Sequence, residues 1–153
     1  MKILLYQPQI PQNTGNIIRT CKVTGATLIL IEPLGFDMSE KSLRRAQLDY
    51  AKDMDIQIFP TFKEALKTID GPIYFLSSKG TKNLFDVKLD QNVTLVFGNE
   101  KSGLSEEIMS EFKDYLVRLP MKEDERCLNL SNAVAISTYE VLRQNNFNFK
   151  YEE

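Results

Sequence analysis

Residues 119–140 read LPMKEDERCLNLSNAVAISTYE, and this stretch decides how the rest of the chain is interpreted. A loop with charges of both signs runs into Asn129-Leu130-Ser131-Asn132, after which small and apolar residues predict a helix over 131–145. Ser131 has a side chain that suits a helix N-cap. Because the first backbone N–H groups of a helix lack partners within it, this junction is predicted to bind a polar ligand.

Apolar, β-rich runs alternate with helical patterns along residues 1–153, which predicts a single α/β domain. Alternation of this kind is typical of a parallel sheet with helices on both faces. The expected strands are 3–6, 27–31, 57–59, 73–76, 93–97 and 116–119. The expected helices are 14–24, 39–48, 61–69, 105–112 and 131–145, with a capping box at Thr61–Glu64 and a C-cap at Gly25.

The composition excludes several kinds of chemistry. The chain has no histidine, and its two cysteines, Cys21 and Cys127, form no CxxC pair. Zinc sites of the usual kind and catalysis by Ser-His-Asp or Cys-His groups are therefore excluded, and no metal is expected. A net charge of −2 argues against coating nucleic acid by bulk charge, so RNA binding would depend on local basic groups. No apolar run is long enough for a membrane span and no signal-like segment begins the chain, so a cytoplasmic location is expected.

Four loops are predicted to meet at the carboxyl ends of the strands, where ligands of parallel sheets bind. They are 7–13, 77–83, 98–103 and 120–130. The first loop carries no GxGxxG, and Leu104 stands where a P-loop needs lysine. Dinucleotide binding of the Rossmann type and nucleoside triphosphate hydrolysis are therefore disfavoured.

Two further motifs accompany the opening stretch. They are Asn13-Thr14-Gly15-Asn16-Ile17-Ile18-Arg19 and residues 95–104, LVFGNEKSGL. In this order, the three motifs resemble those of the SPOUT superfamily of knotted RNA methyltransferases. The resemblance is greatest to the small tRNA (cytidine/uridine-2′-O-)-methyltransferases that act on the wobble nucleotide.

The resemblance implies a fold, a reaction and partners. It implies a C-terminal trefoil knot in which 119–132 threads through an earlier loop. It also implies methyl transfer from S-adenosyl-L-methionine to the ribose 2′-hydroxyl of cytidine or uridine 34, in the anticodon stem-loop of tRNA. Relatives pair through helices that include the last one, so a homodimer is expected.

Candidate catalytic residues lie on helix faces. Ile17, Ile18 and Cys21 predict the buried stripe of helix 14–24, which leaves Asn16 and Arg19 almost opposite to it. The resemblance implies that Arg19 lies at the catalytic centre, as a base or as a group that orients the hydroxyl. It gives Tyr139 a place near the active site, and it assigns Asn16, Arg44 and Arg45 to RNA binding.

Candidate cofactor residues lie at strand ends and in the loop before the last helix. By resemblance these are Leu76, Gly98, Leu119, Cys127 and Leu128. The glycine at 98 is expected to let a ligand approach the backbone closely. Cys127 replaces the serine usual in the family. Glu100 is expected either to order its loop or to face the positive charge of the cofactor.

Three alternatives remain open from the sequence. One is an RNA-binding or ribosome-assembly factor that keeps the fold without turnover. The second is methyl transfer to rRNA, although relatives of that kind commonly carry an added RNA-binding domain. The third is a nucleotide-binding enzyme of flavodoxin type, against which the first loop and the Asn-Leu-Ser-Asn helix start both argue.

Overall fold

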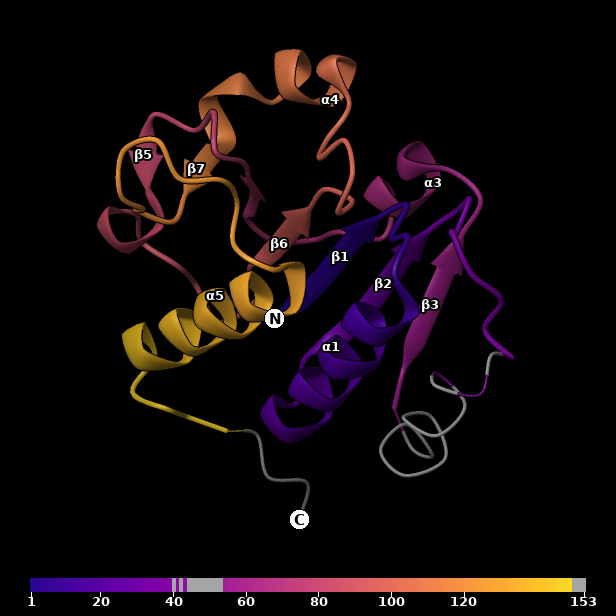
Figure 1. Ribbon diagram of the computed structural model, residues 1–153. Helices are drawn as coiled ribbons and strands as arrows, with labels where there is room; N and C mark the ends of the chain where they lie inside the picture. Colours follow the sequence, from indigo (N-terminus) through magenta and orange to yellow (C-terminus); the bar gives the residue numbers. More distant parts are fainter. Residues whose placement is uncertain (40, 42, 44–53, 150–153) are drawn as a thin grey trace.

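A parallel sheet of seven strands forms the centre of the molecule (Figure 1). The computed structural model describes residues 1–39, 41, 43 and 54–149. The strand order is β3-β2-β1-β6-β4-β7-β5, and every strand pairing in the sheet is parallel. The strands are β1 (Lys2–Tyr6), β2 (Thr27–Ile31), β3 (Ile56–Phe59), β4 (Ile73–Leu76), β5 (Lys82–Asn83), β6 (Thr94–Phe97) and β7 (Leu116–Arg118). The six predicted strands are confirmed, and β5 is an addition that the sequence did not suggest.

The helices also follow the predicted alternation. They are α1 (Pro11–Thr24), α3 (Phe62–Leu66), α4 (Glu106–Glu111) and α5 (Leu130–Gln144), with 3₁₀ turns η1 (Leu84–Asp86) and η2 (Lys113–Tyr115). The Thr61 hydroxyl accepts the backbone N–H of Glu64, and Gly25 ends α1 at φ 69°, so the N-cap at Thr61 and the C-cap at Gly25 are confirmed. The Glu64 carboxylate accepts the Thr61 hydroxyl at 3.3 Å, and not the backbone N–H that a full capping box uses. The helix expected over 39–48 lies mostly outside the described residues.

Helices cover both faces of the sheet. Alternate residues of β1 enter different cores, with Ile3 and Leu5 packing under α1 and α5, and Leu4 under α3 and α4. Such alternation along a strand whose side chains are all buried is typical of a parallel sheet covered on both faces. α1 and α5 lie side by side on their face, as Figure 1 shows.

Residues 77–81 form a short bridge across strand β7. In the sheet β7 lies between β4 and β5, although β4 and β5 are consecutive along the chain. Leu76 and Lys82 both pair with Val117, from opposite sides. A Cβ atom at Gly80 would lie 2.6 Å from the carbonyl carbon of Val117, so the bridge packs directly on the backbone of β7.

β7 therefore passes beneath a connection made by an earlier part of the chain, and a knotted chain needs such a passage. The trefoil knot itself, with 119–132 as the threaded segment, stays a prediction.

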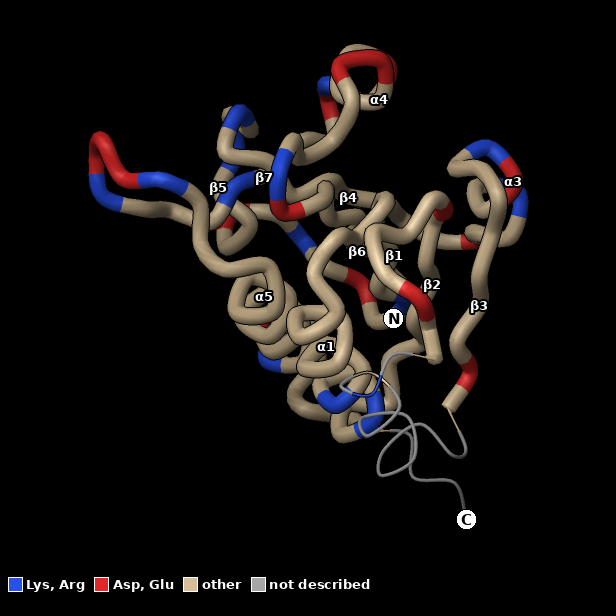
Figure 2. The backbone as a smooth tube through the Cα atoms, turned by 45° about the vertical axis from the view of Figure 1, so that its right-hand side comes forward, with Lys and Arg blue, Asp and Glu red and all other residues tan. Residues whose placement is uncertain are grey.

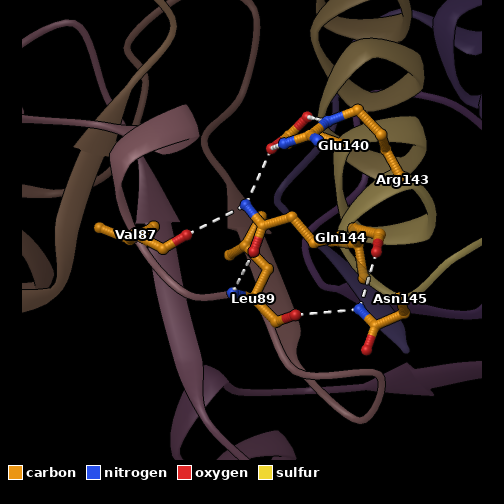
Figure 3. A network of polar contacts seen from close by, with 7 residues as sticks. Val87, Leu89, Glu140, Arg143, Gln144 and Asn145 are labelled. Atoms are coloured by element: carbon orange, nitrogen blue, oxygen red, sulfur yellow. Dashed lines mark hydrogen bonds and ion pairs between the residues drawn. The ribbon is translucent and has the colours of Figure 1, made fainter.

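A polar clamp fixes the C-terminal turns of α5 to the segment before β6 (Figure 3). The Gln144 amide donates to the carbonyl oxygen of Val87 at 3.1 Å and to Glu140 at 2.8 Å, and its oxygen accepts the N–H of Leu89 at 2.9 Å. Glu140 also accepts two hydrogen bonds from the Arg143 guanidinium, each 2.8 Å long. These bonds lower the pKa of the Glu140 carboxyl below its usual value, the Arg143 hydrogen bond contributing most.

Candidate active site

The loops after β6, β4 and β7 open at one edge of the sheet. These three strands are neighbours and run parallel, so their carboxyl ends lie side by side. Leu76 pairs with Phe97 and with Val117, and therefore Leu76, Gly98 and Leu119 lie at or just beyond the ends of adjacent strands. The structure thus brings together three of the five residues predicted to bind the cofactor, whose binding role stays a prediction.

Gly98 is packed against the protein's own backbone. A Cβ atom there would lie 2.2 Å from the carbonyl carbon of Gly103 and 2.3 Å from the nitrogen of Leu104. Such contacts leave no room for any side chain at 98. The absence of a side chain is therefore explained by the fold of the loop, and the expected reason, close approach of a ligand, is not needed.

The turn after Gly98 closes on itself. The N–H of Asn99 donates to the carbonyl oxygen of Gly103 at 3.2 Å, and the reverse bond is 3.0 Å long. The side-chain oxygen of Asn99 accepts the backbone N–H groups of Lys101 and Ser102 at 3.0 and 2.8 Å. Hydrogen bonds within the loop therefore give this turn its internal shape.

The carboxylate of Glu100 reaches the start of α1. It accepts the backbone N–H groups of Gln9 at 2.8 Å and Ile10 at 3.1 Å, and the side-chain amide of Asn13 at 3.2 Å. Ile10 is the N-cap residue of α1 and offers no side-chain acceptor, while the first turn contains no acidic residue. Glu100 thus supplies the negative charge and the acceptor that this helix start needs. Of the two roles expected for Glu100, these contacts support the ordering of its loop.

Asn13 continues this connection to α5. The Asn129 amide donates to the side-chain oxygen of Asn13 at 3.0 Å, and the Asn129 oxygen accepts the N–H groups of Ser131 and Asn132. Asn129 is therefore the N-cap of α5, and the prediction of Ser131 was wrong. An asparagine here caps the helix with its oxygen and holds Asn13 with its nitrogen, whereas a serine has a single hydroxyl for both roles.

Glu100, Asn13 and Asn129 together form a loop network that joins the starts of α1 and α5 to the turn after β6. Sequence reasoning quoted all three residues within motifs but did not connect them. The available signal was position: Asn13 and Asn129 lie at the starts of helices and Glu100 lies just after a strand, and these points meet at one edge of a parallel sheet. No local sequence pattern links residues so far apart in the chain.

The loop between β7 and α5 carries the remaining cofactor candidates. From Pro120 to Asn129 every residue is exposed, and the backbone groups of the loop make one hydrogen bond among themselves, from Glu125 to Lys122. Cys127 and Leu128 lie in this loop. Backbone donors and acceptors beside exposed apolar side chains suit an adenine ring and a methionine chain. The residues present therefore fit S-adenosyl-L-methionine.

The candidate catalytic side chains lie on the two neighbouring helices. Asn16 and Arg19 are exposed on α1, opposite the buried stripe as predicted, and Tyr139 is 48% exposed on α5. Arg19 lies about 12 Å along α1 from its start, and Tyr139 about 14 Å along α5. Both side chains are thus well down their helices from the edge that carries the loops. Arg44 and Arg45 lie outside the described residues.

Other features bear on what the site can contain. Burial raises the pKa of the Cys21 thiol to about 12, so this cysteine stays protonated and is not a nucleophile. In the described parts of the chain no three His, Cys, Asp or Glu side chains are grouped as metal ligands. A hollow of about 800 Å³ lies at the opposite edge of the sheet, lined by residues that include Met1, Thr27 and Asn92. None of the helices in the described ranges is long and apolar enough to cross a membrane.

Two solved structures have this arrangement of strands and helices. One, titled as giving structural insights into the 2-OH methylation of C/U34 on tRNA, has a TM-score of 0.87 and 37% identity, over 95% of this chain and 90% of that one. The other is the SpoU methyltransferase AviRb from Streptomyces viridochromogenes in complex with the cofactor AdoMet. It has a TM-score of 0.82 and 25% identity, over 95% of this chain and 58% of that one. The fold and its loop-lined edge are thus those of the SpoU-type methyltransferases.

Two curated relatives are similar along nearly their whole length. The tRNA (cytidine(34)-2′-O)-methyltransferase of Methylovorus glucosotrophus is 43% identical over 147 residues, which are 95% of this chain and 96% of the relative. The enzyme of the same name from Saccharophagus degradans is 43% identical over 148 residues, with the same two coverages. The family model described as the SpoU rRNA Methylase family matches residues 1–139. The chain belongs to this family.

Proposed function

We propose that this protein transfers a methyl group from S-adenosyl-L-methionine to the 2′-hydroxyl of the ribose at position 34 of tRNA, where the base is cytidine or uridine. The observation that carries the proposal is the 43% identity, over 95% of the chain, to enzymes named for that reaction. We place the reaction in the cytoplasm, because tRNA is found there.

The cofactor would be held by the loops after β4, β6 and β7. Three of the candidate residues, Leu76, Gly98 and Leu119, lie at adjacent strand ends, and Cys127 and Leu128 lie in the exposed loop beside them. The loop network joins the turn after Gly98 to the start of α5. These two segments, which border the site, are therefore fixed relative to each other. The bound cofactor would supply an electrophilic methyl group on its sulfonium.

The chain's own contribution to the reaction is then alignment of the ribose, and the proton of the 2′-hydroxyl would leave to water. The guanidinium of Arg19 presents a planar set of donors, which suits a sugar hydroxyl and its neighbouring phosphate. We assign Arg19 to orienting the ribose 2′-hydroxyl, with Tyr139 beside it and Asn16 in contact with RNA.

A homodimer would complete the site. Arg19 lies about two helical turns from the loops of its own subunit, so a second subunit is a natural source of the arginine that meets them. Asn132, Ile136, Tyr139 and Arg143 form an exposed stripe along α5 in which Ile136 is 41% and Tyr139 48% exposed. Apolar surface of this kind on a helix marks an interface, and two-fold pairing is the commonest assembly.

Methyl transfer to rRNA is the second candidate, because the family description names rRNA. Incubation of the protein with labelled cofactor and either total tRNA or total rRNA separates the two. We expect label in tRNA alone, and cleavage mapping should find the 2′-O-methyl group at nucleotide 34. Label in rRNA alone, or at another tRNA position, would overturn the proposal.

A further inference from the structure

The edge of the sheet formed by β5 and β7 carries cations that are unpaired within the described residues. Lys79 lies in the bridge, Lys82 on β5 and Arg118 on β7, and all three are exposed. The register of the two strands pairs Lys82 with Val117 and Asn83 with Arg118, so Lys82 and Arg118 are one register position apart and their side chains leave this edge on opposite faces of the sheet. Figure 2 shows basic residues on β5 and β7, and both basic and acidic residues on the turns beside them, which include Asp86 and Asp114.

None of these three cations forms an ion pair with the part of the chain that the structure describes. The ion pair observed there joins Glu140 and Arg143, on α5. The Lys82 ammonium donates to a backbone carbonyl, that of Asp114, at 3.1 Å. The bridge and β5, residues 77–83, contain two lysines and no acidic residue. In a chain of net charge −2, such a segment is a local positive surface.

Exposed aromatic rings flank the same two strands. Phe85 follows β5 in turn η1 and is 44% exposed, and Tyr115 precedes β7 in turn η2 and is 50% exposed. Neither ring is needed to fill the cores on the two faces of the sheet, whose members are other residues. Cations that track a phosphate backbone, alternating with rings on which bases stack, are the features of surfaces that bind single-stranded RNA.

This edge adjoins the candidate cofactor loops. Lys79 is three residues beyond Leu76, and Arg118 directly precedes Leu119. An RNA strand lying along β5 and β7 would therefore run beside the methyl donor. The loop from Pro120 to Asn129, which leaves the same strand, has two basic and three acidic residues, so its net charge is −1 and it adds no positive charge to this edge.

We propose that the β5–β7 edge, formed by Lys79, Lys82 and Arg118 with Phe85 and Tyr115, binds the RNA strand next to the target nucleotide. The cations contact phosphates, and the two rings stack on bases. This inference rests on the proposed function for the identity of the RNA, and it adds a contact surface beyond Asn16, Arg44 and Arg45.

The test compares two pairs of lysines that carry the same charge. Lys79→Gln combined with Lys82→Gln removes two charges from the edge. The control combines Lys63→Gln with Lys67→Gln. Both lysines are exposed; Lys63 lies in α3 and Lys67 directly follows it, and α3 packs against β2 and β3, away from β5 and β7. Binding of unfractionated tRNA is measured for both over a range of potassium chloride concentrations, together with calorimetric binding of S-adenosyl-L-methionine and the melting temperature.

We expect the edge variant to bind tRNA about tenfold more weakly at moderate salt, with the slope of log affinity against log salt reduced by about 1.4 for two lost phosphate contacts. Its cofactor affinity and melting temperature should be unchanged, and the control should bind tRNA as the wild type does. Tyr115→Ala alone should weaken tRNA binding without changing the salt slope, because stacking involves no counterion.

Three results would overturn the inference. One is equal weakening by both lysine pairs, which would indicate bulk charge. The second is unchanged tRNA binding by the edge variant. The third is a parallel loss of cofactor affinity, which would assign the lysines to the cofactor site. Failure of this inference can be distinguished from failure of the proposed function. If the proposed function is wrong, the wild-type protein transfers no methyl group to tRNA, and this result does not depend on how the two variants bind RNA.

Discussion

Arg19 lies on the exposed side of α1, whereas Ile17, Ile18 and Cys21 on the other side are fully buried. Arg19→Ala should therefore lower methyl transfer to tRNA about 100-fold or more, since alignment of the hydroxyl is lost. The melting temperature should stay within about 2 °C of the wild type, as is usual for an exposed position. Lys22→Ala, one turn further on the exposed side, is the control and should retain activity. Wild-type turnover in Arg19→Ala would remove this residue from the catalytic centre.

Glu100 gives a prediction of the opposite kind, in which stability changes with activity. The carboxylate of Glu100 accepts two backbone N–H groups and the Asn13 amide. Glu100→Gln keeps the shape of this side chain but removes its charge. Unfolding in urea should show a loss of about 1–3 kcal/mol, and calorimetry should show weaker cofactor binding because the turn after Gly98 loses its anchor. Glu111→Gln, at the exposed end of α4, should change neither quantity. If Glu100→Gln were as stable as the wild type, the loop network would not hold the helix starts together.

Gly98 shows how a correct position can be predicted for an incomplete reason. The sequence motif marked this glycine, and it does follow the end of β6. The atoms that exclude a side chain are those of Gly103 and Leu104, whose positions depend on how the loop folds back. A substitution such as Gly98→Val would therefore disturb the turn before any question of ligand binding arises, so it cannot test cofactor contact.

Among the elements, those with an apolar period were predicted well. β1, β2, β4 and β6 are runs of large aliphatic or aromatic residues, and such runs indicate buried strands directly. β5 was missed because it is two polar residues long and exists only through its pairing with β7. The start of α1 was predicted three residues late, because its N-cap Ile10 has no capping side chain and the acceptor for the N–H groups of Gln9 and Ile10 is Glu100, far along the chain.

The clamp at the end of α5 predicts how stability depends on pH. The pKa of Glu140 is lowered in the folded protein, chiefly by the Arg143 hydrogen bond, so the folded state favours the charged carboxylate. The stabilisation is therefore complete above the unfolded value of about 4.5 and is lost as the pH falls through the lower folded value. Glu140→Gln should cost about 1–3 kcal/mol near neutral pH.

Urea unfolding of the wild type and of Glu140→Gln at neutral and acidic pH measures this difference. It should shrink as the pH falls below about 4.5, because the unfolded chain then takes up the proton first, and it should vanish once the pH is below the lower folded pKa, where the folded carboxyl is neutral as well. A difference that stays constant with pH would mean that Glu140 acts by packing and not by charge.

At the scale of the whole molecule, the homodimer is the prediction to test. Ile136→Lys introduces a charge beside Tyr139 in the exposed stripe of α5 and should give a monomer by light scattering at micromolar concentration, with methyl transfer reduced at least about tenfold. Ile58→Lys, at the 44% exposed position on edge strand β3, is the matched control and should stay dimeric and active. A monomeric Ile136→Lys protein with full activity would contradict the shared site.

The assembly of the site from distant segments explains which of its parts could be predicted. The resemblance gave the residues, and the alternation of strands and helices gave the edge at which they meet. The loop network and the bridge were not predicted, because they join residues 9–13, 77–81, 100, 117 and 129, which no local pattern connects.

The bridge over β7 also has a consequence for synthesis on the ribosome. A nascent chain makes residues 77–83 well before residues 116–118, yet the Ser77 N–H donates to the carbonyl oxygen of Val117, and β5 pairs with β7 alone among the described strands. Until the ribosome has released β7 and the 119–129 loop, the bridge and β5 lack the strand on which they pack, and the last of the three cofactor loops is missing. A chain terminated prematurely before residue 116 is therefore a protein without a site, and cofactor binding distinguishes finished molecules from unfinished ones.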